Sequence, residues 1–493
     1  MSSFKIETAK PSEDDNSNLE NLKSSDYDAE LERALESYVP DSDAEKRLVR
    51  KIDITTMPLL WFMYLLACID RQNIGNAKIA GMDVDLSLSD DQYAMLLTVF
   101  SIAYFIFEVP SNLLLTRTKP SFYLAGIMIA WGIVCVAMGV IRNYPSMLGL
   151  RLSLGAIEAG FFPGALFLMT CWYKKSEVGK RFSIFYSASV VSGAMGGLLA
   201  GIITGNMEGS RGIRGWRWLY ILQGSITIAV AIVAKFLLLD FPEQSSRFMK
   251  LEERQLVILR MVHDRNTIAK RHKTHLTPAQ AFKAAIIDPR TYIFIVLFVL
   301  NSGSMTITYF IPTIVQSMGY NSVVAQYMTI PVWMVGIVFL VGLSYTADRT
   351  ADRRWHISGC LGLSFICTVV CIAVSSDRVL YAMVSLYIAG LHTALPLILN
   401  WASEVISLPS EKRAVALALV NSIGNLSPVY GSRLWPSSDG PRYTKGFVTT
   451  GVLTGFGMLL AALIPVLLKY LGKKGRTEAE RGVADQEPGH NRG

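Results

Sequence analysis

The sequence predicts an all-α polytopic membrane protein with twelve transmembrane helices in two six-helix halves. Two features of composition lead to this fold class: apolar residues make up 51% of the 493-residue chain, and charged residues only 17%. A soluble protein carries about a quarter charged residues. The third feature is the recurrence of runs of about 18 or more apolar residues, each able to cross a hydrocarbon core roughly 30 Å thick. These runs exclude a soluble enzyme.

The chain begins with a polar, acidic stretch that is poor in aromatic residues. We expect residues 1–50 to form a disordered cytosolic tail. Twelve apolar segments follow, and only helices supply so many spans of this length. They run over residues 57–77, 92–114, 122–141, 148–172, 182–206, 216–240, 290–312, 326–346, 355–375, 379–401, 411–432 and 447–469.

The longest polar connection divides the spans six and six. We therefore expect an N-terminal half over residues 51–240, a cytosolic linker over 241–289, a C-terminal half over 290–470 and a cytosolic tail over 471–493. Two such halves around a polar linker are typical of transporters built from repeated bundles. The linker contains a helical-looking stretch, Leu251–His263. We interpret it as an interfacial helix at an anionic membrane face, the alternative being a regulatory or partner-binding site.

Lys and Arg are concentrated in the connections on the side of the N-terminus. Such an excess marks the cytosolic side of a membrane protein, so we expect both termini and the linker in the cytosol. The formal charge of +8 then reflects orientation, and no nucleic-acid partner is expected. The basic residues of the short connections on this side are Arg117, Lys119, Lys174, Lys175, Lys180, Arg181, Arg349, Arg353, Arg354, Lys412 and Arg413.

The six cysteines do not indicate a disulfide scaffold or a metal site. Five lie inside apolar runs, and the sixth, Cys171, ends one. We expect them to be small buried side chains, and we expect no metal and no cofactor. The sequence also lacks a Walker A motif, a metal triad and a nucleophile elbow. Neither ATP-driven transport nor enzymatic activity is therefore expected.

Four charged residues lie at membrane depth, where an ionisable group is costly unless it is paired or faces water. The first span ends with Asp70 and Arg71, and the fourth contains Arg151 and Glu158. The latter two are seven residues apart, on one helix face, so both are expected to line one cavity. Arginines can grip a carboxylate in a bidentate manner, and the acids can exchange protons. The alternative is two buried salt bridges that only hold helices together.

Further polar and aromatic residues complete the candidate set. Asn73 on the first span, Tyr309 on the seventh, and His392 and Trp401 on the tenth are candidates for the substrate and proton site. Tyr309 and Trp401 are equally compatible with ordinary packing, and His392 with a structural histidine. The expected gating residues lie near the inner ends of the spans, where Glu108 is expected to pair with loop bases: Glu108, Asn112, Asp348, Arg349 and Arg353.

Four sequence motifs resemble a known family. They are Asp70–Ala77, Phe107–Asn112, Gly155–Gly164 and Ala347–Arg354. Over about residues 45–472 the chain resembles the major facilitator superfamily, and within it the fungal allantoate permease branch of the anion:cation symporters. The resemblance implies the major facilitator fold. It also implies that the acid–arginine pairs of the first and fourth spans form a proton-coupled anion site.

The leading functional hypothesis is a monomeric plasma-membrane symporter. It would import a small organic anion, such as a vitamin-like carboxylate, together with a proton. A related carrier that exports or compartmentalises a fungal secondary metabolite is the second hypothesis, since direction follows gradients rather than motifs. A non-transporting nutrient receptor is the third, and it is disfavoured because such receptors carry longer cytosolic tails than this chain has.

Overall fold

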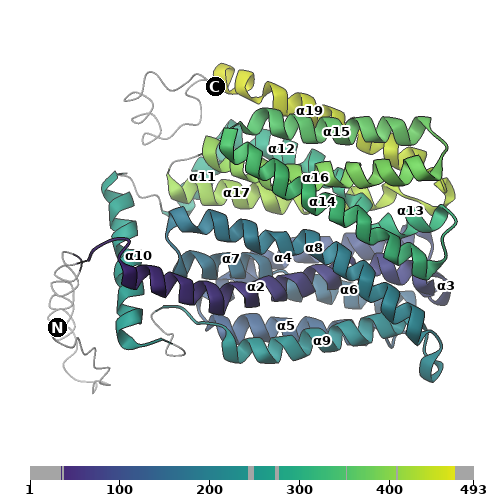
Figure 1. Ribbon diagram of the computed structural model, residues 1–493, viewed down its shortest axis with the longest axis horizontal. Coiled ribbons are helices and arrows are strands. Elements are labelled where there is room, and N and C mark those ends of the chain that lie inside the picture. The colour runs from purple at the N-terminus through teal and green to yellow at the C-terminus, as the bar shows by residue number, and fades with distance from the viewer. Residues whose placement is uncertain are drawn as a thin grey trace.

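The computed structural model describes residues 35, 38–242, 249–271, 277–350, 352–406 and 409–471, and their regular structure is helical. Twelve helices of this part of the chain are long and apolar enough to cross a membrane. They lie nearly parallel in an elongated bundle (Figure 1). The predicted fold class is therefore confirmed.

The first six spans form the N-terminal half of the bundle. Its fourth span is broken at Gly160 into α6 and α7, just before the Phe-Phe-Pro sequence with which α7 begins. The helices of this half are α2 (Asp43–Ala77), α3 (Asp83–Asp85), α4 (Asp90–Thr116), α5 (Pro120–Met138), α6 (Tyr144–Glu158), α7 (Phe161–Trp172), α8 (Lys175–Met207) and α9 (Gly215–Leu237), with a π-helix, η1 (Lys78–Met82), between α2 and α3.

The last six spans form the C-terminal half. Two of them are interrupted, the seventh by a 3-10 turn at η3 and the eleventh by a turn before Pro428. The elements are α12 (Pro289–Ser304), η3 (Met305–Tyr309), α13 (Ile311–Ser317), α14 (Ser322–Thr350), α15 (Arg353–Ala373), α16 (Asp377–Val405), α17 (Ser410–Gly424), α18 (Pro428–Gly431), η4 (Ser432–Leu434), η5 (Ser437–Asp439) and α19 (Thr444–Leu471).

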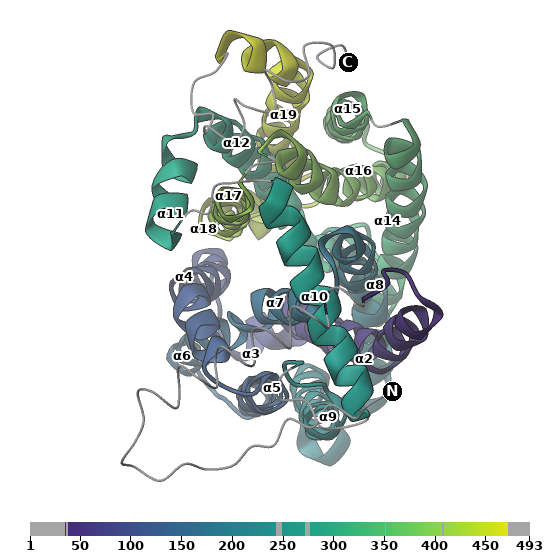
Figure 2. The ribbon, with the colours of Figure 1, turned by 90° about the vertical axis from the view of Figure 1, so that its left-hand side faces the viewer.

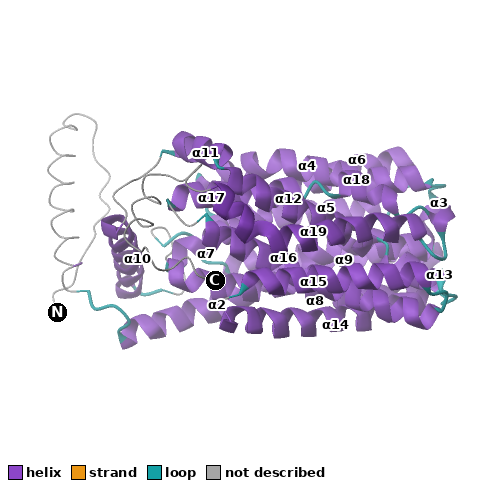
Figure 3. Cartoon of the chain, turned by 90° about the horizontal axis from the view of Figure 1, so that it is seen from above, coloured by secondary structure: helices purple, strands orange, loops and turns teal. Residues whose placement is uncertain are grey.

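The bundle has two distinct ends. Helix α10 (Leu251–Arg271) and helix α11 (Pro278–Ile287) lie at the end where α2 begins and α19 finishes. We call this the terminal end, and we call the opposite end, with α3 and α13, the far end (Figures 1 and 3). Seen from the terminal end, α10 runs across the bundle (Figure 2).

Helices α8 and α14 form the longest contact between the halves. Glycines on α8 allow it, because a side chain at Gly193 would overlap the Trp333 indole and one at Gly201 would overlap the Tyr327 ring. Small residues let membrane helices approach closely in this way. The two halves are thus held side by side along α8 and α14.

The first helix begins earlier than the sequence indicates. Helix α2 starts at Asp43, inside the stretch expected to be disordered, with the Ser42 side chain accepting a hydrogen bond from the Glu45 amide. The reason is a buried ionic cluster that composition does not reveal. Glu45 is paired with Lys174 at 2.6 Å and with Arg260 of α10 at 3.0 Å. Residues 1–34 lie outside the described part of the chain.

The linker helix α10 is fixed to the N-terminal half. The fully buried Arg260 guanidinium donates to Glu45, to Glu177 and to the Trp172 carbonyl. About two turns before Arg260 on α10, Glu253 binds Lys51 of α2 at 2.8 Å. Burial alone would raise the pKa of the Glu253 carboxyl, but the hydrogen bond from Lys51 lowers it. The charged groups of Glu253 and Arg260 on α10 are therefore paired with protein side chains and not with lipid head groups.

We predict that Arg260→Met destabilises the protein. The substitution leaves the buried Glu45 carboxylate with one cation fewer, and breaking a buried pair in this way costs about 3 kcal/mol. Thermal unfolding in detergent should show a clearly lower midpoint. The matched control is Lys46→Met, because Lys46 lies on the exposed face of α2, 3.8 Å from Asp43. Equal midpoints for both variants would contradict the assignment.

Candidate functional site

A cavity lies between the two halves near the middle of the bundle. It encloses about 1070 Å³, counting the solvent at its mouth. Its walls combine aromatic rings with neutral hydroxyl and amide groups, and Arg71 is the one charged side chain among the described lining residues. The lining residues on which the argument depends are Tyr64, Cys68, Arg71, Gln72, Phe100, Tyr104, Phe298, Tyr309, His392, Asn421 and Asn425.

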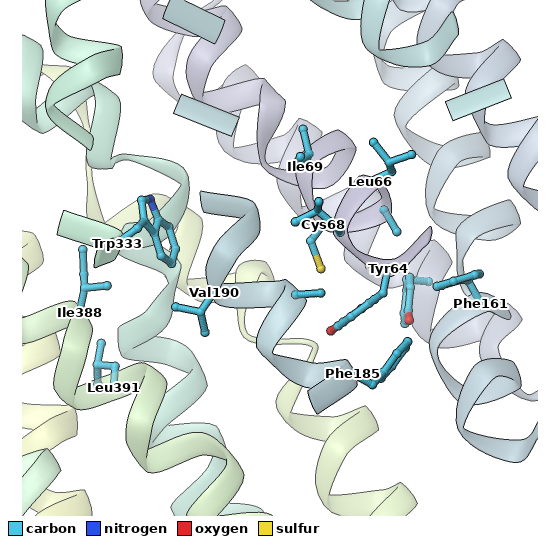
Figure 4. Close-up of a cluster of buried hydrophobic side chains, with 14 of the residues drawn as sticks. Tyr64, Leu66, Cys68, Ile69, Phe161, Phe185, Val190, Trp333, Ile388 and Leu391 are labelled. Carbon is cyan, nitrogen blue, oxygen red and sulfur yellow. The ribbon is translucent and has the colours of Figure 1, made fainter. Parts of the chain in front are cut away.

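The aromatic wall on the N-terminal half is closely packed. The rings of Tyr64 and Phe185 stack with centroids 4.5 Å apart, and Phe162 packs against both. Figure 4 shows Tyr64 beside Phe185, with Cys68 on the next turn of α2 and Trp333 of the other half across from them. Stacked rings of this kind form a rigid surface. The wall can therefore hold a flat or apolar ligand body without rearranging.

Arg71 and Glu158 form an ion pair at the edge of the cavity. The Arg71 Nη2 lies 2.6 Å and its Nε 3.2 Å from Glu158 Oε1. The side chain of Arg71 is 25% exposed and that of Glu158 only 1%. The guanidinium also lies over the Tyr104 ring, 4.8 Å from its centroid. A ligand in the cavity thus meets the cation first, and the carboxylate lies behind it.

A second guanidinium lies deeper in the same half. Arg151 is fully buried, and neither its Nε nor its Nη1 has a hydrogen-bond partner in the described structure. Its central carbon is 5.4 Å from the Phe100 centroid, the same distance as that of Arg71. Phe100 thus contacts both cations through its π-system. Arg151 is not among the described residues that line the cavity, whereas Phe100, which lies against it, is.

Asp70 does not face the cavity either. It accepts hydrogen bonds from Trp131 Nε1 at 3.3 Å and Thr227 Oγ1 at 2.9 Å, inside the N-terminal half. Consecutive residues of an α-helix point about 100° apart, so the turn that aims Arg71 at the cavity aims Asp70 at α5 and α9. The four charges expected around one cavity are therefore split, with one on the wall and three behind it.

The remaining candidates for the substrate site differ in position. Tyr309 and His392 line the cavity, and neither ring nitrogen of the buried His392 has a hydrogen-bond partner in the described structure. Asn73 is buried, and its side-chain amide also has no hydrogen-bond partner in the described structure. Trp401 is not a cavity residue: it packs edge-to-face on Phe294 near the terminal end of α16. For Trp401 the packing alternative fits, because its ring is turned into the C-terminal half.

The expected gating residues form two groups. In the C-terminal half, Arg353 binds Asp348 at 2.6 Å and Glu404 at 3.2 Å, which joins α14, α15 and α16 at the terminal end. Arg349 is not part of this cluster and lies over the Tyr345 ring instead.

On α4, Glu108 accepts a hydrogen bond from Ser422 of α17 at 3.0 Å, whereas a loop base was expected as its partner. The reason is that Glu108 faces the other half rather than the loop. Asn112 lies half-buried one turn further along α4. The gating roles of these residues stay predictions.

Sequence reasoning missed several cavity residues and one buried cation. Gln72, Tyr104, Asn421 and Asn425 are single polar residues in apolar helices, and nothing in their spacing marks them. Lys78 at the far end was missed as well, because a lysine beside a loop usually extends into water. In the described residues no group of three His, Cys, Asp or Glu side chains is placed to hold a metal ion.

Twelve spanning helices in two halves around a central cavity define the class of membrane transporters. The chain belongs to the Major Facilitator Superfamily, whose family model matches residues 60–432. The predicted superfamily is thereby confirmed, and the allantoate permease branch stays a prediction.

Two relatives show how far the similarity extends. The chain is 32% identical over 463 residues to the MFS-type transporter cnsO of Penicillium expansum, covering 90% of this chain and 88% of that one. It is 28% identical to a putative tartrate transporter of Agrobacterium vitis, covering 92% and 97%.

Solved structures with low sequence identity to this chain share its fold. An inward-facing, unoccupied bacterial homolog of the human lysosomal transporter Spinster superposes with a TM-score of 0.65 at 17% identity, covering 86% of this chain and 98% of that one. A D-xylose-proton symporter superposes with a TM-score of 0.63 at 16% identity, covering 83% and 96%.

We predict that Asp70→Asn keeps the protein stable and Asp70→Leu does not. The amide retains an oxygen for Trp131 and Thr227, whereas leucine leaves two buried donors unpartnered, at about 1–3 kcal/mol each. Thermal unfolding followed by tryptophan fluorescence separates the two variants. If Asp70→Leu unfolds at the same temperature as Asp70→Asn, these hydrogen bonds do not hold α2 against α5 and α9.

Proposed function

We propose that this transporter carries a small organic anion together with a proton, and that the anion binds Arg71. The observation that carries the proposal is the geometry of the Arg71–Glu158 pair, with the cation on the cavity wall and the acid buried behind it. A guanidinium binds a carboxylate through two parallel hydrogen bonds. An incoming carboxylate can therefore take the place that Glu158 now occupies.

Coupling to a proton follows from the cost of a buried charge. When the anion takes Arg71, Glu158 loses its ion-pair partner while its side chain is only 1% exposed. An unpaired buried carboxylate costs several kcal/mol, and protonation removes that cost. Anion and proton thus enter together. The loaded site carries less net charge than the site with the anion alone, and it can pass between the open states of the two halves.

The distribution of charge over the cavity favours a monocarboxylate. The C-terminal half contributes neutral groups to the described lining, among them His392, Asn421 and Asn425. A second carboxylate on the ligand would find no cation there, whereas a hydroxyl, an amide or a ring nitrogen would find hydrogen-bond partners. The aromatic rings that the N-terminal half contributes to the lining, among them Tyr64, Phe100 and Phe162, fit a cyclic or apolar body. This proposal differs from the substrate in the name of the Agrobacterium relative, since tartrate is a dicarboxylate.

We further propose that the protein acts as a monomer in the plasma membrane with its terminal end in the cytosol. The excess of Lys and Arg in the connections at this end supports the orientation. The allantoate permease branch remains the proposed subfamily, on the motifs around Asp70 and Glu158. Export or compartmentalisation of an anionic secondary metabolite is the second candidate, because the aromatic walls accept a larger ring body equally well.

The substrate class is tested by uptake of labelled carboxylates in cells that express the protein. We expect a cyclic monocarboxylate to accumulate at acidic outside pH and a dicarboxylate of the same ring not to accumulate. Arg71→Lys keeps the charge but loses the planar fork, so apparent affinity should fall about tenfold while proton dependence remains. Uptake that is equal for both carboxylates, or independent of Arg71, would contradict the proposal.

Proton coupling is tested with Glu158→Gln, which imitates the protonated acid. The variant should exchange labelled for unlabelled substrate across the membrane but lose accumulation driven by a pH gradient, by about tenfold or more. The matched control is Glu252→Gln on the exposed face of α10. A Glu158→Gln protein that still concentrates its substrate like the control shows that Glu158 is a structural partner of Arg71 and not the coupling residue.

A further inference from the structure

Another buried cation, Lys78, lies at the far end of the bundle, away from the cavity. Lys78 is the first residue of the π-helix η1, and its side chain is only 6% exposed. Its ammonium lies 4.4 Å from the Tyr93 centroid and 5.8 Å from the Phe310 centroid. It also donates to Ser437 Oγ at 3.3 Å. π-Helical turns inside α-helices are frequent at functional positions.

The cage around Lys78 is built from both halves of the protein. Tyr93 and Asp90 belong to α4 of the N-terminal half, whereas Phe310 and Ser437 belong to the C-terminal half. The nearest carboxylate oxygen, Asp90 Oδ1, is 3.7 Å from the ammonium. Asp90 is bound more closely by Ser437, whose amide and hydroxyl each donate to it at 2.7 Å. Lys78 and Asp90 thus form a long ion pair, while Ser437 binds the acid more closely and the two rings lie against the lysine.

Neighbouring hydrogen bonds close the same end. Ser322 of α14 donates to the Ile79 carbonyl at 2.6 Å, and the Tyr93 hydroxyl donates to the Tyr309 carbonyl at 3.3 Å. A side chain at Gly75 would lie 2.6 Å from that Tyr309 carbonyl, so the backbones are in close contact there. The far end is therefore shut across the interface between the halves, and Lys78 lies at the centre of this closure.

We propose that Lys78 is the gating residue of the far end and that it works by exchanging partners. In the closed state it binds Phe310 and Ser437, while Ser437 occupies Asp90. When the halves separate at this end, Lys78 and Asp90 both remain on the N-terminal half. Each has lost its partner in the C-terminal half, so the long ion pair that already joins them at 3.7 Å shortens to a direct hydrogen bond. Because both states satisfy both charges, neither is strongly favoured, as a two-state carrier requires.

The position of Lys78 also links the gate to the anion path. Lys78 directly follows the last residue of α2 and lies seven residues after Arg71, which is about two helical turns along one face. When the far end opens, Lys78 therefore lies on the path that leads to Arg71. The proposal rests on the alternating access put forward above, but it holds for any substrate.

The test uses the native thiol of Cys68, which lines the cavity. The full-length protein is reconstituted in liposomes, and an impermeant methanethiosulfonate is added. Labelling of Cys68 is quantified by mass spectrometry. Only molecules whose C-terminal tag is protected from added protease are counted, because in these the terminal end lies inside the liposome and the far end faces the reagent. Lys78→Gln should be labelled about fivefold faster than wild type, since it loses a cation–π contact of a desolvated cage. Lys78→Arg and the exposed far-end control Lys445→Gln should stay near the wild-type rate.

Asp90→Asn provides a second arm if Lys78→Gln does not fold. The amide of this variant keeps an oxygen for Ser437 but loses the charge that pairs with Lys78 in the open state, so we expect Cys68 to be labelled more slowly than in the wild type. Labelling at the wild-type rate or faster overturns the gate. The gate is overturned if Lys78→Gln is labelled at the wild-type rate. It is also overturned if Lys78→Arg is labelled as fast as Lys78→Gln. A Cys68 that never reacts from the far side in any variant overturns alternating access itself, which separates the two failures.

Discussion

The burial of one carboxylate determines how the rest of the site is arranged. Glu158 lies at the last residue of α6, where the fourth span breaks, and its side chain is almost completely inaccessible. It is stabilised there because Arg71 reaches it from α2 at 2.6 Å. A charge in this position must be paired or protonated. Whatever removes Arg71 from Glu158 therefore also decides whether Glu158 holds a proton.

The two halves of the protein have different chemical roles as a consequence. The buried charges around the cavity belong to the N-terminal half, where Phe100 separates the guanidinium on the wall from the buried Arg151. The C-terminal half offers neutral polar groups to the same space. Charge recognition and proton exchange can thus occur within the N-terminal half, while the other half recognises the remainder of the ligand. At the far end the relation is different, because the cage of Lys78 needs residues from both halves.

The fold was predictable from the sequence, because an apolar run of this length satisfies its backbone hydrogen bonds in a membrane by forming a helix. The site was predictable only in part. Residue spacing indicates which face of a helix a side chain occupies, but not which neighbour that face meets. Arg71 and Glu158 were therefore found as candidates, whereas the burial of Arg151 behind Phe100 and the turn of Asp70 toward Trp131 depend on packing between helices. The early start of α2 was missed because the partners of Glu45, Lys174 and Arg260, lie far from it in the sequence.

The central claim is that anion binding transfers a proton to Glu158, and the most direct test counts that proton. Purified protein in weakly buffered detergent solution is titrated with a monocarboxylate that it binds. A pH indicator reports the proton uptake. The account predicts uptake of about one proton for each anion bound by the wild type. It predicts anion binding without proton uptake by Glu158→Gln. Anion binding by the wild type that leaves the pH unchanged, or equal proton uptake by both proteins, would contradict it.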